Sequence, residues 1–244
     1  VIGVVKADAY GHGLVEVSRT LAAAGVRRFA VAIVEEAMAL RDAEVPGQFL
    51  VLGAPLLEQA EEIAEYGFEA MVSDLQFAQL LDAMARRHER TVDVHLKFDT
   101  GMGRLGFHPA EAVDSVRQIA SLTGLRIVGA MTHFPTADVP EGREFTRQQV
   151  ATLKAIRERI ETEGFHIPLW HAANSCATLT LPESHFDAVR PGLALYGGVQ
   201  RSMTPLKFRQ AMSLKTRIVQ LRDLPVGHSV SYGRTFVAKR RTRI

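Results

Sequence analysis

The sequence predicts an α/β protein: a (β/α)8 TIM barrel followed by the start of a second, all-β domain. Eight apolar runs of strand length alternate with segments in which apolar residues recur every three or four positions. Parallel strands need crossover helices, and eight such units favour a closed barrel over a doubly wound open sheet, which usually has fewer. After residue 205 no helical pattern recurs. We therefore predict a barrel over residues 1–205 and the incomplete N-terminal part of a β domain over residues 206–244.

The individual elements follow from these patterns in chain order. The predicted strands are VIGVV (1–5), RFAVAI (28–33), QFLVLGA (48–54), FEAMVS (68–73), TVDVHLKF (91–98), LRIVGAMT (125–132), IPLWHA (167–172) and FDAVRPGLALYG (186–197). The clearest helical patterns between them are at 14–25, 56–67, 75–89 and 145–164. The first two end in glycine, which favours a helix C-terminus, and Asp74 is a good N-cap for the third. Residues 211–225 are predicted as a strand and turn, and residues 226–244 as further strand.

Composition and charge exclude several classes of protein. Hydrophobic residues make up 47% and charged residues 23% of the chain, as in ordinary soluble globular proteins, and the net charge of +2 implies no nucleic-acid partner. No apolar run is long enough to span a membrane. The single cysteine, Cys176, excludes a disulfide framework and a cysteine-based metal site, and it fits a reducing, cytoplasmic compartment. Because residue 1 already lies in an apolar strand, we interpret the chain as a segment of a longer protein.

Polar side chains that could catalyse a reaction or bind a ligand lie at or just after the carboxyl ends of several predicted strands. They are Lys6 at the end of the first, Lys97 and Arg104 at and after the end of the fifth, His133 at the end of the sixth, His171, Asn174 and Ser175 at and after the end of the seventh, and Arg190, Gly192 and Leu193 at the end of the eighth. Each has an ordinary structural explanation when taken alone, such as a solvated lysine or a hydrogen-bonded core histidine. In a barrel, however, all of these strand ends meet at one mouth. Their gathering predicts an active site there.

The last two strand ends also predict a phosphate site. Barrels often bind phosphate in this position through backbone N–H groups. Ser175 offers a hydroxyl, Gly192 lets the backbone approach closely, and Tyr10 in the first loop offers another donor. A phosphate at one end of the mouth and the Lys6 amine at the other suggest a phosphorylated aldehyde cofactor bound as a Schiff base. A barrel that binds a phosphorylated metabolite without lysine chemistry remains an alternative.

Five motifs in order carry a resemblance to a known family. VVKADAYGHG, KFDTGMGRLGF, MTHFPTAD, HAANS and VRPGLALYG resemble the corresponding segments of the alanine racemases. The opening of the second domain, SLKTRIVQLRDLPVGHSVSYGRTF, resembles the same family. These enzymes combine a barrel with a β domain and depend on pyridoxal 5'-phosphate. The resemblance therefore implies racemisation of L-alanine and D-alanine, which supplies D-alanine for cell-wall peptidoglycan.

The resemblance also implies a role for each motif residue. Lys6 would be the Schiff-base lysine and one of two acid/base groups. The cofactor phosphate would be bound by Tyr10, Ser175 and the N–H groups of Gly192 and Leu193. The remaining positions would be Arg190 facing the pyridine nitrogen, His171 holding Arg190, Arg104 binding the substrate carboxylate, and Lys97, His133 and Asn174 in support. In this family a lysine at the position of Lys97 is often carbamylated.

The resemblance leaves one catalytic group outside these 244 residues. The family's second base is a tyrosine in the β domain of the partner subunit of a homodimer, and the matching stretch would begin just past Ile244. We therefore expect residues 1–244 alone to be impaired in activity. Two further readings stay open: a non-catalytic barrel that binds pyridoxal phosphate for homeostasis, and a racemase of another small amino acid such as serine.

Overall fold

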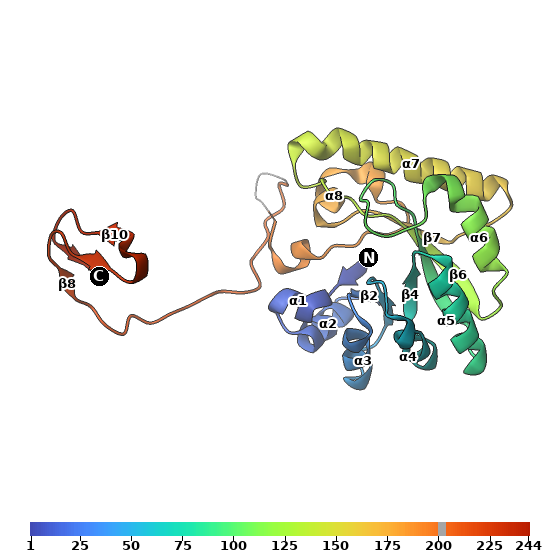
Figure 1. Cartoon of the computed structure of the whole chain (residues 1–244), viewed down its shortest axis with the longest axis horizontal. Helices are drawn as coiled ribbons and strands as arrows, with labels where there is room; N and C mark the ends of the chain where they lie inside the picture. The colour runs from blue at the N-terminus through green and yellow to red at the C-terminus, as the bar shows by residue number, and fades with distance from the viewer. Residues whose placement is uncertain (200–203) are drawn as a thin grey trace. The chain divides into compact units, whose positions relative to one another are not determined.

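The chain forms two compact units. The computed structural model describes residues 1–199 and 204–244, and it divides into Val1–Ala211 and Met212–Ile244. The first unit contains a curled parallel sheet with helices on its outer face (Figure 1). Among the described residues, no helix has both the length and the apolar character needed to cross a membrane.

Seven parallel strands pair in sequential order, as the sequence predicts. They are β1 (Ile2–Val4), β2 (Arg28–Val31), β3 (Gln48–Val51), β4 (Glu69–Val72), β5 (Val92–Lys97), β6 (Leu125–Met131) and β7 (Leu169–His171). Each lies within a predicted apolar run. Between β5 and β6 the register shifts at Val94 and His95. Sequential order of this kind requires a crossover between every pair of neighbours, and it brings the carboxyl ends of all seven strands to one side.

Helices provide these crossovers. They are α2 (Leu14–Ala23), α3 (Val34–Asp42), α4 (Ala60–Tyr66), α5 (Leu75–Arg87), α6 (Ala112–Ala120), α7 (Arg143–Thr162) and α8 (Ser175–Thr180). The segment labelled α1 (Lys6–Gly11) is a left-handed turn rather than an ordinary α-helix. The four clearest helical patterns correspond to α2, α4, α5 and α7. Asp74 caps α5 as predicted, because its Oδ1 accepts a hydrogen bond of 2.8 Å from the Phe77 N–H.

The eighth predicted strand is irregular, and the prediction of a strand over 186–197 is wrong for most of that run. Ala188 forms an isolated parallel bridge to His171 of β7. On the other side, the Ile2 and Val4 N–H groups of β1 donate to the Val189 and Pro191 carbonyls at 2.9 and 3.0 Å. This short segment therefore links β7 to β1 and closes the ring. Proline has no N–H with which to extend the ladder, and residues Leu193–Tyr196 turn into a 3-10 helix instead.

A continuous apolar core holds the helices on the sheet. Its largest fully buried side chains include Trp170, Phe29, Phe49, Phe68 and Phe98. A second, small cluster of Ile2, Val4, Ala30 and Ala188 packs where the ring closes. Burying one such large apolar side chain is worth about 1.5–3 kcal/mol. The barrel therefore has a packed interior, and this core fixes the positions of the strand ends that form its mouth.

The second unit contains two short antiparallel ladders. Strand β8 (Asp223–Leu224) pairs with β11 (Thr242–Arg243), and β9 (Ser229–Val230) pairs with β10 (Phe236–Val237). The strand predicted over 211–225 is wrong for residues 212–221, which are described and carry no strand. A strand needs a hydrogen-bonded neighbour, and among the described residues no backbone group pairs with 213–221.

Candidate active site

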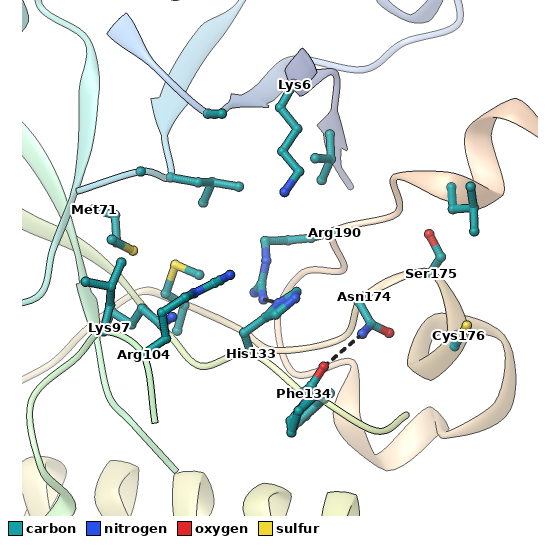
Figure 2. A pocket seen from close by; sticks show the side chains of 18 of the residues that line it. Lys6, Met71, Lys97, Arg104, His133, Phe134, Asn174, Ser175, Cys176 and Arg190 are labelled. Atoms are coloured by element: carbon teal, nitrogen blue, oxygen red, sulfur yellow. Dashed lines mark hydrogen bonds between the residues drawn. The ribbon is translucent and has the colours of Figure 1, made fainter. Parts of the chain in front are cut away.

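A cavity of about 550 Å³ opens at the carboxyl ends of the barrel strands. The residues predicted from the sequence that line it are Lys6, Tyr10, Lys97, Arg104, His133, Asn174, Ser175, Arg190 and Leu193. Figure 2 shows the Lys6 amine pointing into this space, with Arg190, His133, Lys97 and Arg104 facing it from the other strand ends. The two other predicted residues lie against the cavity: His171 is fully buried behind Arg190, and Gly192 contacts Tyr10.

Lys6 is followed by a left-handed turn that the sequence did not reveal. Ala7, Asp8, Ala9 and Tyr10 have φ angles of 52, 52, 53 and 57°. Non-glycine residues avoid this region, at a cost of about 1–2 kcal/mol each. The turn is held by the Asp8 carboxylate, whose Oδ1 accepts a 2.7 Å hydrogen bond from the Leu14 N–H. It places Lys6 and Tyr10 on the cavity side of the chain.

Tyr10, Ser175 and Gly192 converge at one end of the cavity. The Ser175 Oγ accepts hydrogen bonds from the N–H groups of Gly192 and Ala194 at 2.9 and 3.0 Å. A hydroxyl that accepts two such bonds keeps its own proton free to donate. Burial raises the pKa of Tyr10, so its hydroxyl also stays a donor at neutral pH. A Cβ on Gly192 would collide with that hydroxyl, so glycine permits this close approach.

Asn174 fixes the helix that carries Ser175. Its Oδ1 accepts a 3.1 Å hydrogen bond from the Ala177 N–H at the start of α8. Its Nδ2 donates to the Phe134 carbonyl at 3.3 Å, drawn as a dashed line in Figure 2. Asn174 therefore ties the loops after β6 and β7 together beside the cavity.

Arg190 is buried, with 3% of its surface exposed, and is held by neutral acceptors. Nη1 donates to the His171 carbonyl at 2.7 Å and to His171 Nδ1 at 2.8 Å. Nη2 donates to the Thr132 and Ala172 carbonyls at 2.6 and 3.0 Å and lies 3.2 Å from His133 Nδ1. Of the guanidinium donors, only the Nε–H has no acceptor among the described residues. That donor is available to a ligand in the cavity.

Burial and the charge of Arg190 keep both His133 and His171 neutral. Burial lowers the pKa of Arg190 to about 9, which leaves it charged at neutral pH. Burial and then the Arg190 charge lower the pKa of His171 well below its ordinary value. Burial, Arg190 and Lys97 lower the pKa of His133 to about 3. Each ring can therefore accept a hydrogen bond from the guanidinium through Nδ1.

The other end of the cavity carries more cations. Lys97 is 2% exposed, and burial together with the charges of Arg104 and Arg190 lowers its pKa to about 8. In the described part of the chain, no carboxylate lies within 4.0 Å of a charged nitrogen of Lys6, Lys97, Arg104 or Arg190. Four cations without a carboxylate partner make this cavity suited to an anionic ligand.

Asp99 shapes the loop that carries Arg104. Its carboxylate accepts hydrogen bonds from the N–H groups of Gly101, Met102 and Gly103 at 3.0, 2.9 and 2.9 Å. Burial alone would raise the pKa of Asp99, but these N–H groups outweigh it and lower the pKa. The carboxylate is therefore engaged by the loop backbone.

Sequence reasoning missed the apolar lining of the cavity. Leu52 follows β3, Met71 belongs to β4 and Met131 ends β6, and all three line the space. Their positions at strand ends were the available signal. Among the described residues, no group of three or more His, Cys, Asp or Glu side chains could hold a metal ion.

The fold and the site together define a class of protein: parallel barrels with a lysine at the strand ends and a cationic cavity suited to an anionic ligand. Residues 1–200 match the family model of alanine racemase, N-terminal domain, and residues 211–244 match that of alanine racemase, C-terminal domain. The chain belongs to the alanine racemase family, whose members are pyridoxal-phosphate-dependent racemases.

Individual relatives agree with this family. The chain is 38% identical to the alanine racemase of Clostridium perfringens, over 100% of its own length and 64% of the relative's. A solved alanine racemase from Streptomyces lavendulae has a TM-score of 0.87 and 34% identity, covering 99% of this chain and 65% of that one. The Bacillus anthracis enzyme with bound L-Ala-P has a TM-score of 0.87 and 31% identity, covering 99% and 64%. The chain thus spans somewhat less than two thirds of the relatives' length.

Proposed function

We propose that this chain is the cofactor-binding part of an alanine racemase that interconverts L-alanine and D-alanine, for use in cell-wall peptidoglycan. In this proposal residues 1–205 bind pyridoxal 5'-phosphate and residues 206–244 begin the β domain. The single observation that carries the proposal is the joint lining of one cavity by the Lys6 amine, the open Arg190 Nε–H and the Ser175 hydroxyl. A reducing compartment, the cytoplasm, fits the single free cysteine.

The residues present fit this cofactor at both of its ends. The Ser175 and Tyr10 hydroxyls and the Leu193 N–H would hold the phosphate, and the Gly192 N–H would join them by being shared between Ser175 Oγ and the phosphate. A Cβ on Gly192 would fill this cradle. The Arg190 Nε–H would donate to the ring nitrogen. When bound, pyridoxal phosphate supplies an aldehyde that forms a Schiff base with an amine and a ring that delocalises charge.

Lys6 and Arg190 have distinct tasks in this reaction. Lys6 moves the α-proton of alanine on one face of the substrate, as a positioned general base or acid. Arg190 stays protonated at neutral pH, so it would donate a hydrogen bond to the ring nitrogen without giving up its proton. By keeping its proton, Arg190 would favour return of the α-proton to the α-carbon and would suppress transamination.

Arg104 and its neighbours would bind the substrate. The Arg104 guanidinium would pair with the alanine carboxylate, since arginine binds carboxylates through two parallel N–H groups. Lys97 would support Arg104, because a carbamylated lysine carries a negative charge beside it. His133, neutral and in contact with Arg190, would support the second base.

In this proposal Lys6 is the one catalytic base that residues 1–244 provide, and the resemblance implies that the second base, a tyrosine, would belong to the β domain of the partner subunit of a homodimer. We therefore propose that this segment exchanges an α-proton more readily than it inverts the α-carbon. A racemase for serine shares the same mouth residues. A barrel that binds the cofactor without catalysis would form the Schiff base but exchange no α-proton.

The test loads the 244-residue protein with pyridoxal phosphate and records its absorbance. We expect a band at the violet end of the visible range that is absent from Lys6→Ala and retained by Lys154→Ala, a control at an exposed lysine on α7. Borohydride reduction and digestion should place the label on Lys6. No band, or a label on another lysine, would refute the proposal.

A second measurement separates the catalytic alternatives. In D2O, the loaded protein should exchange the α-proton of one enantiomer of alanine faster than it forms the other enantiomer, and faster than it exchanges the α-proton of serine. Lys6→Ala should exchange neither. A band without exchange would support the non-catalytic carrier, and brisk interconversion of L- and D-alanine would contradict the impairment of this segment.

A further inference from the structure

A line of hydrogen-bonded side chains runs through the barrel interior and ends at Arg190. It begins at Glu69, the first residue of β4, whose Oε2 lies 3.2 Å from His95 Nε2. His95 Nδ1 lies 2.8 Å from His171 Nε2, and His171 Nδ1 lies 2.8 Å from Arg190 Nη1. All four residues have at most 3% of their surface exposed. The line therefore connects the amino end of the strands with the mouth.

The chemistry of the two ends fixes the direction of every hydrogen bond in this line. A guanidinium can only donate, and an ionised carboxylate can only accept. His171 must therefore accept from Arg190 at Nδ1 and carry its proton on Nε2, which donates to His95 Nδ1. His95 in turn carries its proton on Nε2 and donates to Glu69. Each ring is left with a single neutral tautomer that satisfies both of its nitrogens.

The charges agree with this assignment. Burial would raise the pKa of Glu69, but the hydrogen bond from His95 and the charge of Arg28 outweigh it and lower the pKa, so Glu69 is ionised. Burial, together with the charge of Arg28, lowers the pKa of His95 more than Glu69 and Asp93 raise it, so His95 is neutral. Arg28 closes the outer end, with its Nε 3.0 Å from Glu69 Oε2.

Gly129 gives the His95 ring the space that this line requires. Gly129 on β6 is the register partner of His95 on β5, just past the shift between the two strands. A Cβ on Gly129 would overlap the His95 ring at Nδ1, the atom that accepts from His171. Any larger residue would therefore displace His95 from His171 without removing a polar group.

We propose that Glu69, His95 and His171 form a positioning relay that fixes the tautomer and orientation of His171 and so directs the Arg190 Nε–H into the cavity. None of the three touches the cavity itself. Without the relay, His171 could rotate or change tautomer and present an N–H to Arg190, which would then lose an acceptor. The identity of the ligand rests on the proposed function, whereas the relay belongs to the cofactor-free barrel.

The first test uses NMR of the histidine ring nitrogens in the cofactor-free protein at neutral pH. We expect His95 and His171 to carry their protons on Nε2 and to give two slowly exchanging ring N–H signals. A proton on Nδ1 of His171, or a charged His95, would overturn the relay. This result does not depend on pyridoxal phosphate binding, so it stands even where the proposed function fails.

The second test compares Gly129→Ala with a matched control. Gly3→Ala also adds a methyl group to a glycine within a strand, but there the nearest atoms lie at 3.4 Å, an ordinary contact. We expect Gly129→Ala to lose the two N–H signals and to bind pyridoxal phosphate about 10-fold more weakly, as for one misplaced hydrogen bond from a charged group. Its affinity for inorganic phosphate, probed at the Ser175 end, should be unchanged. Gly3→Ala should match the wild type in its ring N–H signals, its affinity for pyridoxal phosphate and its affinity for inorganic phosphate.

A pair of substitutions at Glu69 provides an independent comparison if Gly129→Ala folds poorly. Glu69→Gln keeps an oxygen that accepts from His95, whereas Glu69→Leu keeps a similar volume without an acceptor. We expect Glu69→Gln to retain the ring N–H signals with a smaller loss of pyridoxal phosphate affinity, and Glu69→Leu to resemble Gly129→Ala. Equal behaviour of the two variants, or wild-type signals and affinity in Gly129→Ala, would overturn the relay.

Discussion

The left-handed turn after Lys6 predicts an unusual response to glycine. Ala7 has a φ of 52° and is exposed, so its methyl group contributes strain and little packing. Glycine at this position would remove about 1–2 kcal/mol of left-handed cost. It would also add about 0.5–1 kcal/mol of entropy to the unfolded chain, which opposes folding. We therefore expect Ala7→Gly to stabilise the protein by about 0.5–1 kcal/mol.

The same substitution elsewhere provides the control with the opposite sign. Ala151 is exposed in the middle of α7, where the backbone is an ordinary right-handed helix. Ala151→Gly should destabilise the protein by about 0.5–1 kcal/mol. Ala9 is unsuitable for this comparison, because it is fully buried and its removal would also lose packing.

Urea denaturation of the cofactor-free protein measures both effects. The urea concentration at the midpoint of unfolding should rise for Ala7→Gly and fall for Ala151→Gly. The slope of the unfolding free energy against urea concentration should be the same in both variants as in the wild type. A lower midpoint for Ala7→Gly would refute the reasoning, since it would mean that the turn is not left-handed or that the methyl group is needed. The Lys6 band with pyridoxal phosphate should persist, because glycine adopts the same turn without strain.

Two further predictions concern the cavity wall. Because the pKa of His133 is about 3 in the folded protein and 6.5 in the reference state, the unfolded chain binds more protons between these values and stability falls as pH drops below 6.5. His133→Asn should reduce this dependence by up to about 1.4 kcal/mol per pH unit between pH 6 and 4 in urea titrations. Gly192→Ala should destabilise the barrel by about 1–3 kcal/mol through its collision with Tyr10, and adding Tyr10→Phe should recover part of that loss in thermal melts.

The strands were predictable because each is a short apolar run that ends where the pattern changes. Parallel strands in sequential order bury both faces, so their sequences show continuous apolar character. The closing segment was less predictable, because Pro191 has no N–H to extend its ladder, although the Ala188 N–H still donates to the Trp170 carbonyl of β7. Residues 212–221 carry a strand-like pattern, but a pattern alone provides no hydrogen-bonded neighbour.

The mouth was predictable for a different reason. Once the fold is a barrel, every residue at a carboxyl strand end is directed to the same place, so Lys6 and Arg190 could be brought together across 184 positions of sequence by topology alone. The left-handed turn was not visible, because its residues are alanine, aspartate and tyrosine. Nor was the pairing of His95 with His171, which are 76 residues apart. Pairing inside a barrel depends on register and on the shift beside Gly129, which composition does not encode.

The arrangement of charge explains why the barrel holds a buried arginine without a carboxylate beside it. A carboxylate in contact with Arg190 would neutralise the guanidinium and weaken its attraction for a ligand. Carbonyl oxygens and two neutral rings satisfy its donors instead, so the positive charge remains available to the cavity. The balancing charge of Glu69 lies two imidazole rings away and is partly offset by Arg28. By separating charge from countercharge along the barrel, the fold keeps the mouth selective for anions while the interior stays hydrogen-bonded.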